Sequence, residues 1–169
     1  MDEKKLLRSN LHYKTASNKL SQNNIIKINE LIQNTIVCTY IPLKLEININ
    51  SELKGYKELL TTFLDKENIN ICKYESPFIK NKLNVLQPKD PLVAKSVEVF
   101  LTPGLAFTVN GKRLGRGGGY YDRLFSKYPE TLKIGLTSNE RILQDIPIED
   151  HDFFMNYVFT NDKYYKSDI

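Results

Sequence analysis

The hydrophobic positions of this chain follow helical spacing in some segments and strand-like runs in others. Residues 2–19 carry leucines at helical spacing among charged side chains, which predicts an amphipathic helix. Ser21 is a typical helix N-cap, and the apolar face of residues 25–32 predicts a second helix behind it. The same spacing predicts helices over residues 51–64 and 118–128.

Short apolar runs rich in β-branched residues lie between these segments and predict buried strands. The predicted strands are residues 35–41, 69–73, 97–101, 132–136 and 157–160. Strands that alternate with helices indicate an α/β fold with a mostly parallel central sheet flanked by helices. Neither an internal repeat nor a linker divides the chain, so we expect a single domain over residues 1–169.

Composition narrows the class of protein. The 169 residues are 41% hydrophobic and 26% charged, as in ordinary globular proteins, and no apolar run reaches the roughly 20 residues that a membrane helix needs. The N-terminus has no apolar signal-peptide core, so we expect a cytoplasmic protein without a membrane partner. Cys38 and Cys72 lie in apolar runs without metal-ligand spacing, which favours two buried free thiols. The net charge of +4 suits an anionic small molecule, and the chain lacks a nucleic-acid-binding signature.

The most informative segment is the glycine-rich sequence GKRLGRGGGYYDR at residues 111–123. Glycines allow backbone N–H groups to approach a ligand closely, and arginines match the oxygens of a phosphate group. A helix that begins near Tyr120 directs its positive end to the same place. The pattern predicts a binding site for an anion, most simply a nucleotide phosphate.

Two well-known nucleotide motifs are excluded. The segment lacks the GxxxxGK[ST] sequence of a P-loop, and Tyr120 stands where a dinucleotide-binding fingerprint requires glycine or alanine. A bare glycine cluster is also compatible with a flexible turn, but the arginines and the adjacent acid favour a ligand site. Asp122 is the candidate carboxylate for Mg²⁺ beside a phosphate.

The chain resembles the 5-formyltetrahydrofolate cyclo-ligase family, whose members are also called methenyltetrahydrofolate synthetases. The resemblance rests on PGLAF at residues 103–107 and on the glycine-rich segment 111–123. It extends to KxxLR at residues 4–8, YxPxxxE at 40–46 and IPIEDHD at 146–152, all in the family's order. It implies a three-layer α/β sandwich and an enzyme that uses ATP and Mg²⁺ to convert 5-formyltetrahydrofolate into 5,10-methenyltetrahydrofolate.

The resemblance also implies roles for individual residues. The ATP-binding residues would be Lys4, Lys5, Arg8, Arg113, Leu114, Gly115, Arg116, Gly117, Gly118, Gly119, Tyr120 and Tyr121. The folate substrate would contact Ile41, Glu46, Arg116, Gly117, Gly118, Gly119 and Tyr120. Arg116 and Lys4 would be catalytic, and Asp122 and Asp152 would bind the metal. We expect a monomer with these small molecules as its partners.

Two other interpretations of the sequence stay open. The chain departs from the family pattern at four positions, Gln87, Thr108, Arg141 and Asn156. These departures leave the phosphate and Mg²⁺ candidates intact, so the sequence still favours an active enzyme. The alternative is a non-catalytic relative that binds folate or nucleotide. Judged without the resemblance, the charges of residues 4–8, Glu46 and residues 149–152 are also compatible with a solvated surface.

Overall fold

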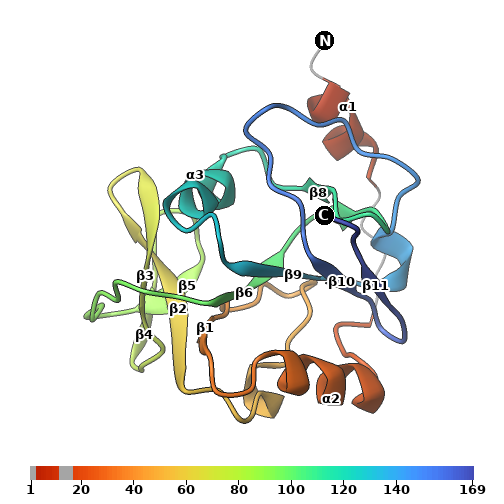
Figure 1. Ribbon diagram of the computed structural model, residues 1–169. Coiled ribbons are helices and arrows are strands. Elements are labelled where there is room, and N and C mark those ends of the chain that lie inside the picture. Colours follow the sequence, from red (N-terminus) through yellow and green to blue (C-terminus); the bar gives the residue numbers. More distant parts are fainter. Residues whose placement is uncertain (1–2, 12–16) are drawn as a thin grey trace.

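The computed structural model describes residues 3–11 and 17–169 (Figure 1). The helices are α1 (Glu3–Asn10), α2 (Gln22–Leu31) and α3 (Tyr120–Lys127), with short 3-10 helices η1 (Asn50–Glu52) and η2 (Asn139–Arg141). The strands of the main sheet are β1 (Ile36–Cys38), β2 (Glu58–Asp65), β3 (Asn68–Lys73), β6 (Val99–Pro103), β9 (Leu132–Leu136), β10 (Tyr157–Phe159) and β11 (Tyr164–Lys166). Two small sheets are formed by β4 (Phe78–Lys80) with β5 (Leu86–Pro88), and by β7 (Ala106–Phe107) with β8 (Arg113–Leu114).

The seven-stranded sheet has the order β11-β10-β9-β6-β1-β2-β3. The pairs from β10 to β2 are parallel, and only the outer pairs, β10 with β11 and β2 with β3, are antiparallel. The chain builds one half of the sheet outward from β1 to β3 and then returns to β6, beside β1, to build the other half. The boundary between β1 and β6 is therefore the switch point of the topology, beyond whose carboxyl ends such sheets bind ligands.

Helices cover both faces of the sheet, so the molecule has the expected three layers (Figure 1). Helix α2 lies on one face, and its Ile25 and Ile28 are buried against Val99, Leu101 and Ile134 of the sheet. Helix α3 lies on the other face with α1 beyond it. The core under α3 contains an aromatic cluster of Phe100, Phe125, Tyr128 and Phe153. The α/β prediction is confirmed.

Most predicted elements are present with shifted ends. Ser21 is the N-cap of α2, because its Oγ accepts a hydrogen bond from the backbone N–H of Asn24 at 3.3 Å. The predicted helix over residues 2–19 ends at Asn10; residues 12–16 lie outside the described part of the chain, and residues 17–19 are not helical. Among the described helices, none combines the length and hydropathy that a bilayer crossing requires.

The predicted helix over residues 51–64 is wrong, because this segment contains strand β2. Gly55 has a φ of +80°, which interrupts a helix, and the following β-branched pair Thr61 and Thr62 favours extended backbone. Strand β2 pairs with β1 on one side and forms a hairpin with β3 on the other. Tertiary pairing therefore outweighs the helical spacing of the leucines.

Candidate functional site

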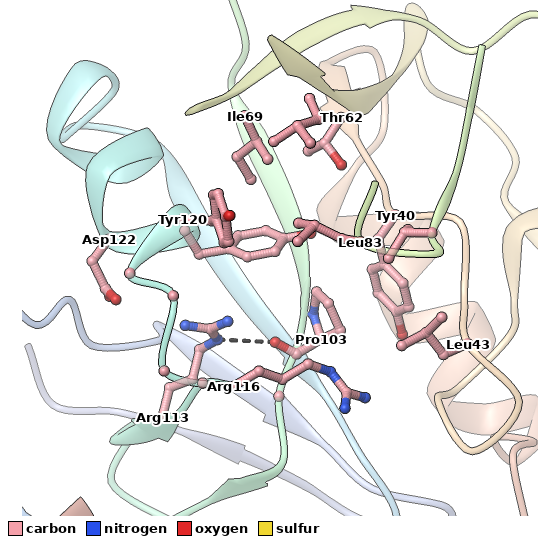
Figure 2. A pocket seen from close by; sticks show the side chains of 18 of the residues that line it. Tyr40, Leu43, Thr62, Ile69, Leu83, Pro103, Arg113, Arg116, Tyr120 and Asp122 are labelled. Atoms are coloured by element: carbon pink, nitrogen blue, oxygen red, sulfur yellow. Dashed lines mark hydrogen bonds between the residues drawn. The ribbon is translucent and has the colours of Figure 1, made fainter. Parts of the chain in front are cut away.

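A cavity of about 230 Å³ opens at the switch point of the sheet. Tyr40 and Ile41, which follow β1, line it on one side, and Pro103 and Gly104 at the end of β6 line it on the other. Figure 2 shows side chains from distant parts of the chain converging on this space. The cavity lies where a parallel α/β sheet binds its ligands, as the sequence predicted for the glycine-rich segment.

The glycine loop, which we define as residues 115–119, forms one wall of the cavity. Gly117 and Gly119 have φ values of +98° and +63°, in the left-handed region that other residues adopt only with strain. Gly119 is the N-cap of α3, so the loop delivers its backbone directly to the positive end of that helix. This geometry suits an anion.

Arg113 is held at the base of the glycine loop. Its Nε donates a hydrogen bond to the carbonyl oxygen of Pro103 at 2.9 Å (dashed line in Figure 2), and its guanidinium lies 4.8 Å from the ring centroid of Tyr121. Burial lowers the pKa of Arg113, whereas the nearby carboxylates of Asp122 and Asp152 act in the opposite direction. A guanidinium remains protonated at neutral pH, so Arg113 presents a fixed positive charge to the cavity.

Arg8 of helix α1 reaches the same loop from the opposite end of the sequence. Its Nε donates a hydrogen bond to the carbonyl oxygen of Gly115 at 2.9 Å, and its guanidinium lies beside Gly117. Arg8 and Lys4, one helical turn apart, both line the cavity. Lys5 is exposed and is not among the described residues that line the cavity, so the structure does not bring it together with the other predicted ATP-binding residues.

Lys4 is almost fully buried, with 7% of its surface exposed, beside the acidic loop 149–152. Its ammonium donates hydrogen bonds to Glu149 Oε2 at 2.9 Å and to Asp152 Oδ2. Burial tends to lower the pKa of Lys4, but the hydrogen bonds to Asp152 and Glu149 outweigh burial and raise the pKa above its ordinary value. Lys4 is therefore a cation at the edge of the cavity.

Three ligand-type side chains gather in the acidic loop. The candidate donor atoms of Glu149, His151 and Asp152 all lie within 4.8 Å of one another. Asp122, in the first turn of α3, also lines the cavity, as Asp152 does. Carboxylate oxygens are the donors that Mg²⁺ prefers, so Asp122 and Asp152 each carry a suitable donor, although Asp122 does not belong to the close group of three. The sequence did not single out Glu149 and His151 as ligands, although both lie within three positions of Asp152 in the chain.

Arg116 and Glu46 meet across the cavity. Arg116 Nη2 donates a hydrogen bond to Glu46 Oε1 at 3.0 Å, while Glu46 Oε2 accepts the backbone N–H of Leu43 at 2.9 Å. In Figure 2 the side chain of Arg116 extends away from the glycine loop toward Leu43. The structure thus joins a predicted catalytic residue to a predicted folate-binding residue.

Two other predicted ATP-binding residues occupy different environments. The side chain of Leu114 is fully buried with Leu105, Ala106 and Ile146, so only its backbone is available to a ligand. Tyr120 lines the cavity, with the guanidinium of Arg123 5.0 Å from its ring centroid.

An apolar wall on the far side of the cavity was missed by the sequence analysis. Its described residues come from the β2–β3 and β4–β5 hairpins: Phe63, Leu64, Ile69, Leu83, Val85 and Leu86. The turn of the β4–β5 hairpin is organised by Asn81, whose Oδ1 accepts the backbone N–H groups of Leu83 and Val85. Flat apolar ligand parts bind well to such a wall.

The four departures from the family pattern lie outside the described cavity lining. Gln87 Oε1 accepts hydrogen bonds from the backbone N–H of Leu64 and from Asn81, both at 2.9 Å, and so fastens the β4–β5 hairpin to β2. Thr108 is buried in a turn, Asn156 Oδ1 accepts the backbone N–H of Lys133, and Arg141 is buried. Of the four, Gln87 supports the cavity, because its partners Leu64 and Asn81 both line it.

The fold and the cavity together define an α/β protein with a switch-point cavity that cationic side chains, a glycine loop and an apolar wall line. Comparison with known sequences then gives the family. The chain belongs to the 5-formyltetrahydrofolate cyclo-ligase family, whose model matches residues 2–161.

Individual relatives agree with this assignment. The mitochondrial 5-formyltetrahydrofolate cyclo-ligase of Arabidopsis thaliana is 29% identical over 141 residues, which are 68% of this chain and 51% of that protein. The 5-formyltetrahydrofolate cyclo-ligase of Escherichia coli K12 is 32% identical over 95 residues, 53% of this chain and 52% of that protein. The matched part thus spans about half the length of each of these curated relatives.

Solved structures show the same fold. A 5,10-methenyltetrahydrofolate synthetase from Aquifex aeolicus superposes with a TM-score of 0.72 at 24% identity, covering 87% of this chain and 79% of that one. The corresponding protein of Mycoplasma pneumoniae gives a TM-score of 0.63 at 19% identity, covering 96% and 100% of the two chains.

Proposed function

We propose that this protein catalyses the ATP- and Mg²⁺-dependent cyclisation of 5-formyltetrahydrofolate to 5,10-methenyltetrahydrofolate, with release of ADP and phosphate. The observation that carries the proposal is the convergence of three segments on one cavity: Lys4 and Arg8 of α1, the glycine loop, and Glu149, His151 and Asp152 of the acidic loop. These segments are distant in sequence, and each belongs to a motif of the family. Their meeting at the switch point supports a shared role in binding one set of substrates.

The reaction requires the oxygen of a formamide to leave, and that oxygen is a poor leaving group. In the proposed sequence the formyl oxygen attacks the γ-phosphorus of ATP, and ADP departs. N10 of the folate then attacks the formyl carbon, the C–O bond breaks with loss of phosphate, and N10 releases its proton. Phosphoryl transfer depends mainly on positioning and on compensation of charge, which cationic side chains and backbone N–H groups supply.

The residues of this chain take the following roles. Arg113 and the N–H groups of the glycine loop hold the phosphates, and Arg8 keeps the loop in place. Arg116 compensates the charge of the transferred phosphoryl group. Lys4 lies at the edge of the cavity and contributes a second cation there.

Asp122 and Asp152 are the proposed metal ligands, because their carboxylates line the same cavity. When bound, Mg²⁺ would neutralise phosphate oxygens and orient the triphosphate. The ammonium of Lys4 already pairs with Asp152, which indicates that the acidic loop is suited to cations.

The folate would occupy the side of the cavity that holds Ile41, Glu46 and the apolar wall. The carboxylate of Glu46 is fixed by the backbone of Leu43 and can accept hydrogen bonds from the N–H groups of a pterin. The apolar wall then packs against the flat rings. The cytoplasmic location, the monomeric state and the extent of the domain stay predictions.

A direct assay tests this function. Purified protein with ATP, Mg²⁺ and 5-formyltetrahydrofolate should form a product that absorbs in the near ultraviolet and should release one ADP per product. Arg116→Ala should lower the rate on the order of a hundredfold, the usual cost of removing a donor that stabilises transition-state charge. Folded protein that binds both substrates and releases no ADP would instead be a non-catalytic folate- and nucleotide-binding relative.

A further inference from the structure

The ion pair between Arg116 and Glu46 joins two groups that the proposed function assigns to different substrates. Arg116 Nη2 lies 3.0 Å from Glu46 Oε1. In the proposed function Arg116 acts on the phosphoryl group at the point where it reaches the formyl oxygen, whereas Glu46 binds the pterin. As long as the pair persists, the guanidinium of Arg116 is not available to the phosphate, and Oε1 of Glu46 is not available to the pterin.

The two partners differ in how firmly they are held. Glu46 is 8% exposed, and its second oxygen accepts the backbone N–H of Leu43. The side chain of Arg116 is 55% exposed. Its neighbours in the chain are glycines, of which Gly115 is half-buried and Gly117 is exposed. Arg116 is therefore the more exposed and less constrained partner, and Glu46 is the buried acceptor that holds its guanidinium.

We propose that the Arg116–Glu46 pair is a latch that couples folate binding to nucleotide binding. This inference rests on the proposed function. The N–H groups of a bound pterin take over the carboxylate of Glu46, and the released guanidinium turns toward the phosphates of the nucleotide. Because coupling between two binding sites is reciprocal, each substrate then tightens the binding of the other.

The latch has a chemical consequence. Without folate, Arg116 stays on Glu46, and the γ-phosphate lacks the cation that compensates its charge during transfer. Transfer of the phosphoryl group to water is then slow, so ATP is consumed only when the formyl acceptor is present. The pair thus favours productive transfer over hydrolysis.

The binding experiment uses Mg²⁺ with β,γ-imido-ATP, a nucleotide that does not transfer its phosphate, measured by calorimetry with and without saturating 5-formyltetrahydrofolate. For the wild-type protein we expect folate to tighten nucleotide binding about fivefold. Glu46→Gln should bind the nucleotide about fivefold more tightly without folate and should lose the response to folate. Arg116→Gln should also show no response to folate.

Two controls separate the latch from a general effect of charge. Asp145→Asn removes the same charge and breaks the ion pair with Lys112, which lies outside the described cavity lining, so nucleotide binding should be unchanged. In the Arg116→Gln background, Glu46→Gln should no longer tighten nucleotide binding. Equal tightening in that background, or no tightening in the single variant, overturns the latch.

The latch and the proposed function fail in different ways. Turnover without any folate effect on nucleotide affinity would overturn the latch and leave the enzyme. Coupled binding without release of ADP would overturn the enzyme and leave the latch. A wild-type protein that does not bind the nucleotide at all would overturn both.

Discussion

Arg8 donates a hydrogen bond from Nε to the carbonyl oxygen of Gly115 at 2.9 Å, and this bond fastens the first helix of the chain to the glycine loop. The two residues are separated by 107 positions in sequence. The guanidinium also lies 3.4 Å from the place that a side chain at Gly117 would occupy. Helix α1 therefore shapes the loop as well as adding charge to the cavity.

This contact predicts a sharp difference between two cations of the same helix. Arg8→Gln should weaken nucleotide binding by about tenfold, because it removes a charge-assisted hydrogen bond that orders the loop. Lys5→Gln removes the same charge from an exposed position outside the described lining and should change binding less than twofold, as expected for surface charges. Calorimetric titration of both variants with Mg-ATP measures the difference, and equal effects would contradict the role of Arg8.

Gly117 offers a test of the backbone conformation of the loop. Its φ of +98° is strained for any other residue, and an added Cβ would lie 3.4 Å from the guanidinium of Arg8. Gly117→Ala should lower kcat/KM more than tenfold and cost about 1–2 kcal/mol of unfolding free energy.

Gly55→Ala is the matched control for Gly117→Ala. Gly55 also has a positive φ, +80°, but lies in the η1–β2 connection, outside the described cavity lining. This variant should lose a comparable or larger amount of stability, because its Cβ would meet the side chain of Gln33. Its kcat/KM should be retained. Urea unfolding and steady-state kinetics on both variants distinguish strain at the site from strain elsewhere.

The sequence predicted the charged side of the site because its residues are contiguous and chemically distinctive. Residues 111–123 combine glycines, arginines and an acid, and no ordinary core segment needs that combination. The structure places Arg113, Arg116 and Asp122 on one cavity, as that pattern requires. These residues could be predicted together because they are neighbours in the sequence. Lys4 and Asp152 are 148 positions apart, so only the fold shows that they pair.

The apolar side of the site could not be predicted for two physical reasons. The leucines of strand β2 repeat at helical spacing and so predict a helix, although pairing with β1 and β3 decides the conformation. The β4–β5 hairpin has strands of three residues each, too short to give an alternating pattern. Side chains such as Leu83 are recognisable as cavity residues only after the hairpin is placed.

Tyr121 supports the guanidinium of Arg113 through its ring, whose centroid lies 4.8 Å away. Tyr121→Leu should weaken nucleotide binding about fivefold, because it removes a cation–π contact of about 1 kcal/mol that fixes the arginine. Tyr121→Phe keeps the ring and should bind the nucleotide almost as the wild-type protein does. A phenylalanine variant as weak as the leucine variant would assign the effect to the phenolic hydroxyl group instead.

Substitution of Asp122 should affect the binding of Mg²⁺ and leave the binding of folate unchanged. Asp122→Asn should raise the Mg²⁺ concentration for half-maximal rate on the order of tenfold, since an amide is a weaker ligand than a carboxylate for this ion. Folate binding should be unchanged, because Glu46 and the apolar wall are not altered. Magnesium titrations of the rate, with folate affinity measured separately by fluorescence, give both quantities, and an equal loss of folate binding would show that Asp122 has a structural role.

The buried thiols predict how stability depends on alkaline pH. Burial raises the pKa of Cys72 from 9.0 to about 11 and raises the pKa of Cys38 as well. At a pH between 9.0 and about 11, the unfolded chain loses the Cys72 proton and the folded chain keeps it. The free energy of unfolding must therefore fall as pH rises through this range. The fall approaches about 1.4 kcal/mol per pH unit for each thiol.

Cys72→Ala should be less stable at neutral pH by about 1–2 kcal/mol, yet its stability should decline less steeply above pH 9.0 in urea unfolding experiments. Parallel alkaline slopes for the variant and the wild-type protein would mean that the thiol of Cys72 titrates alike in the folded and unfolded states.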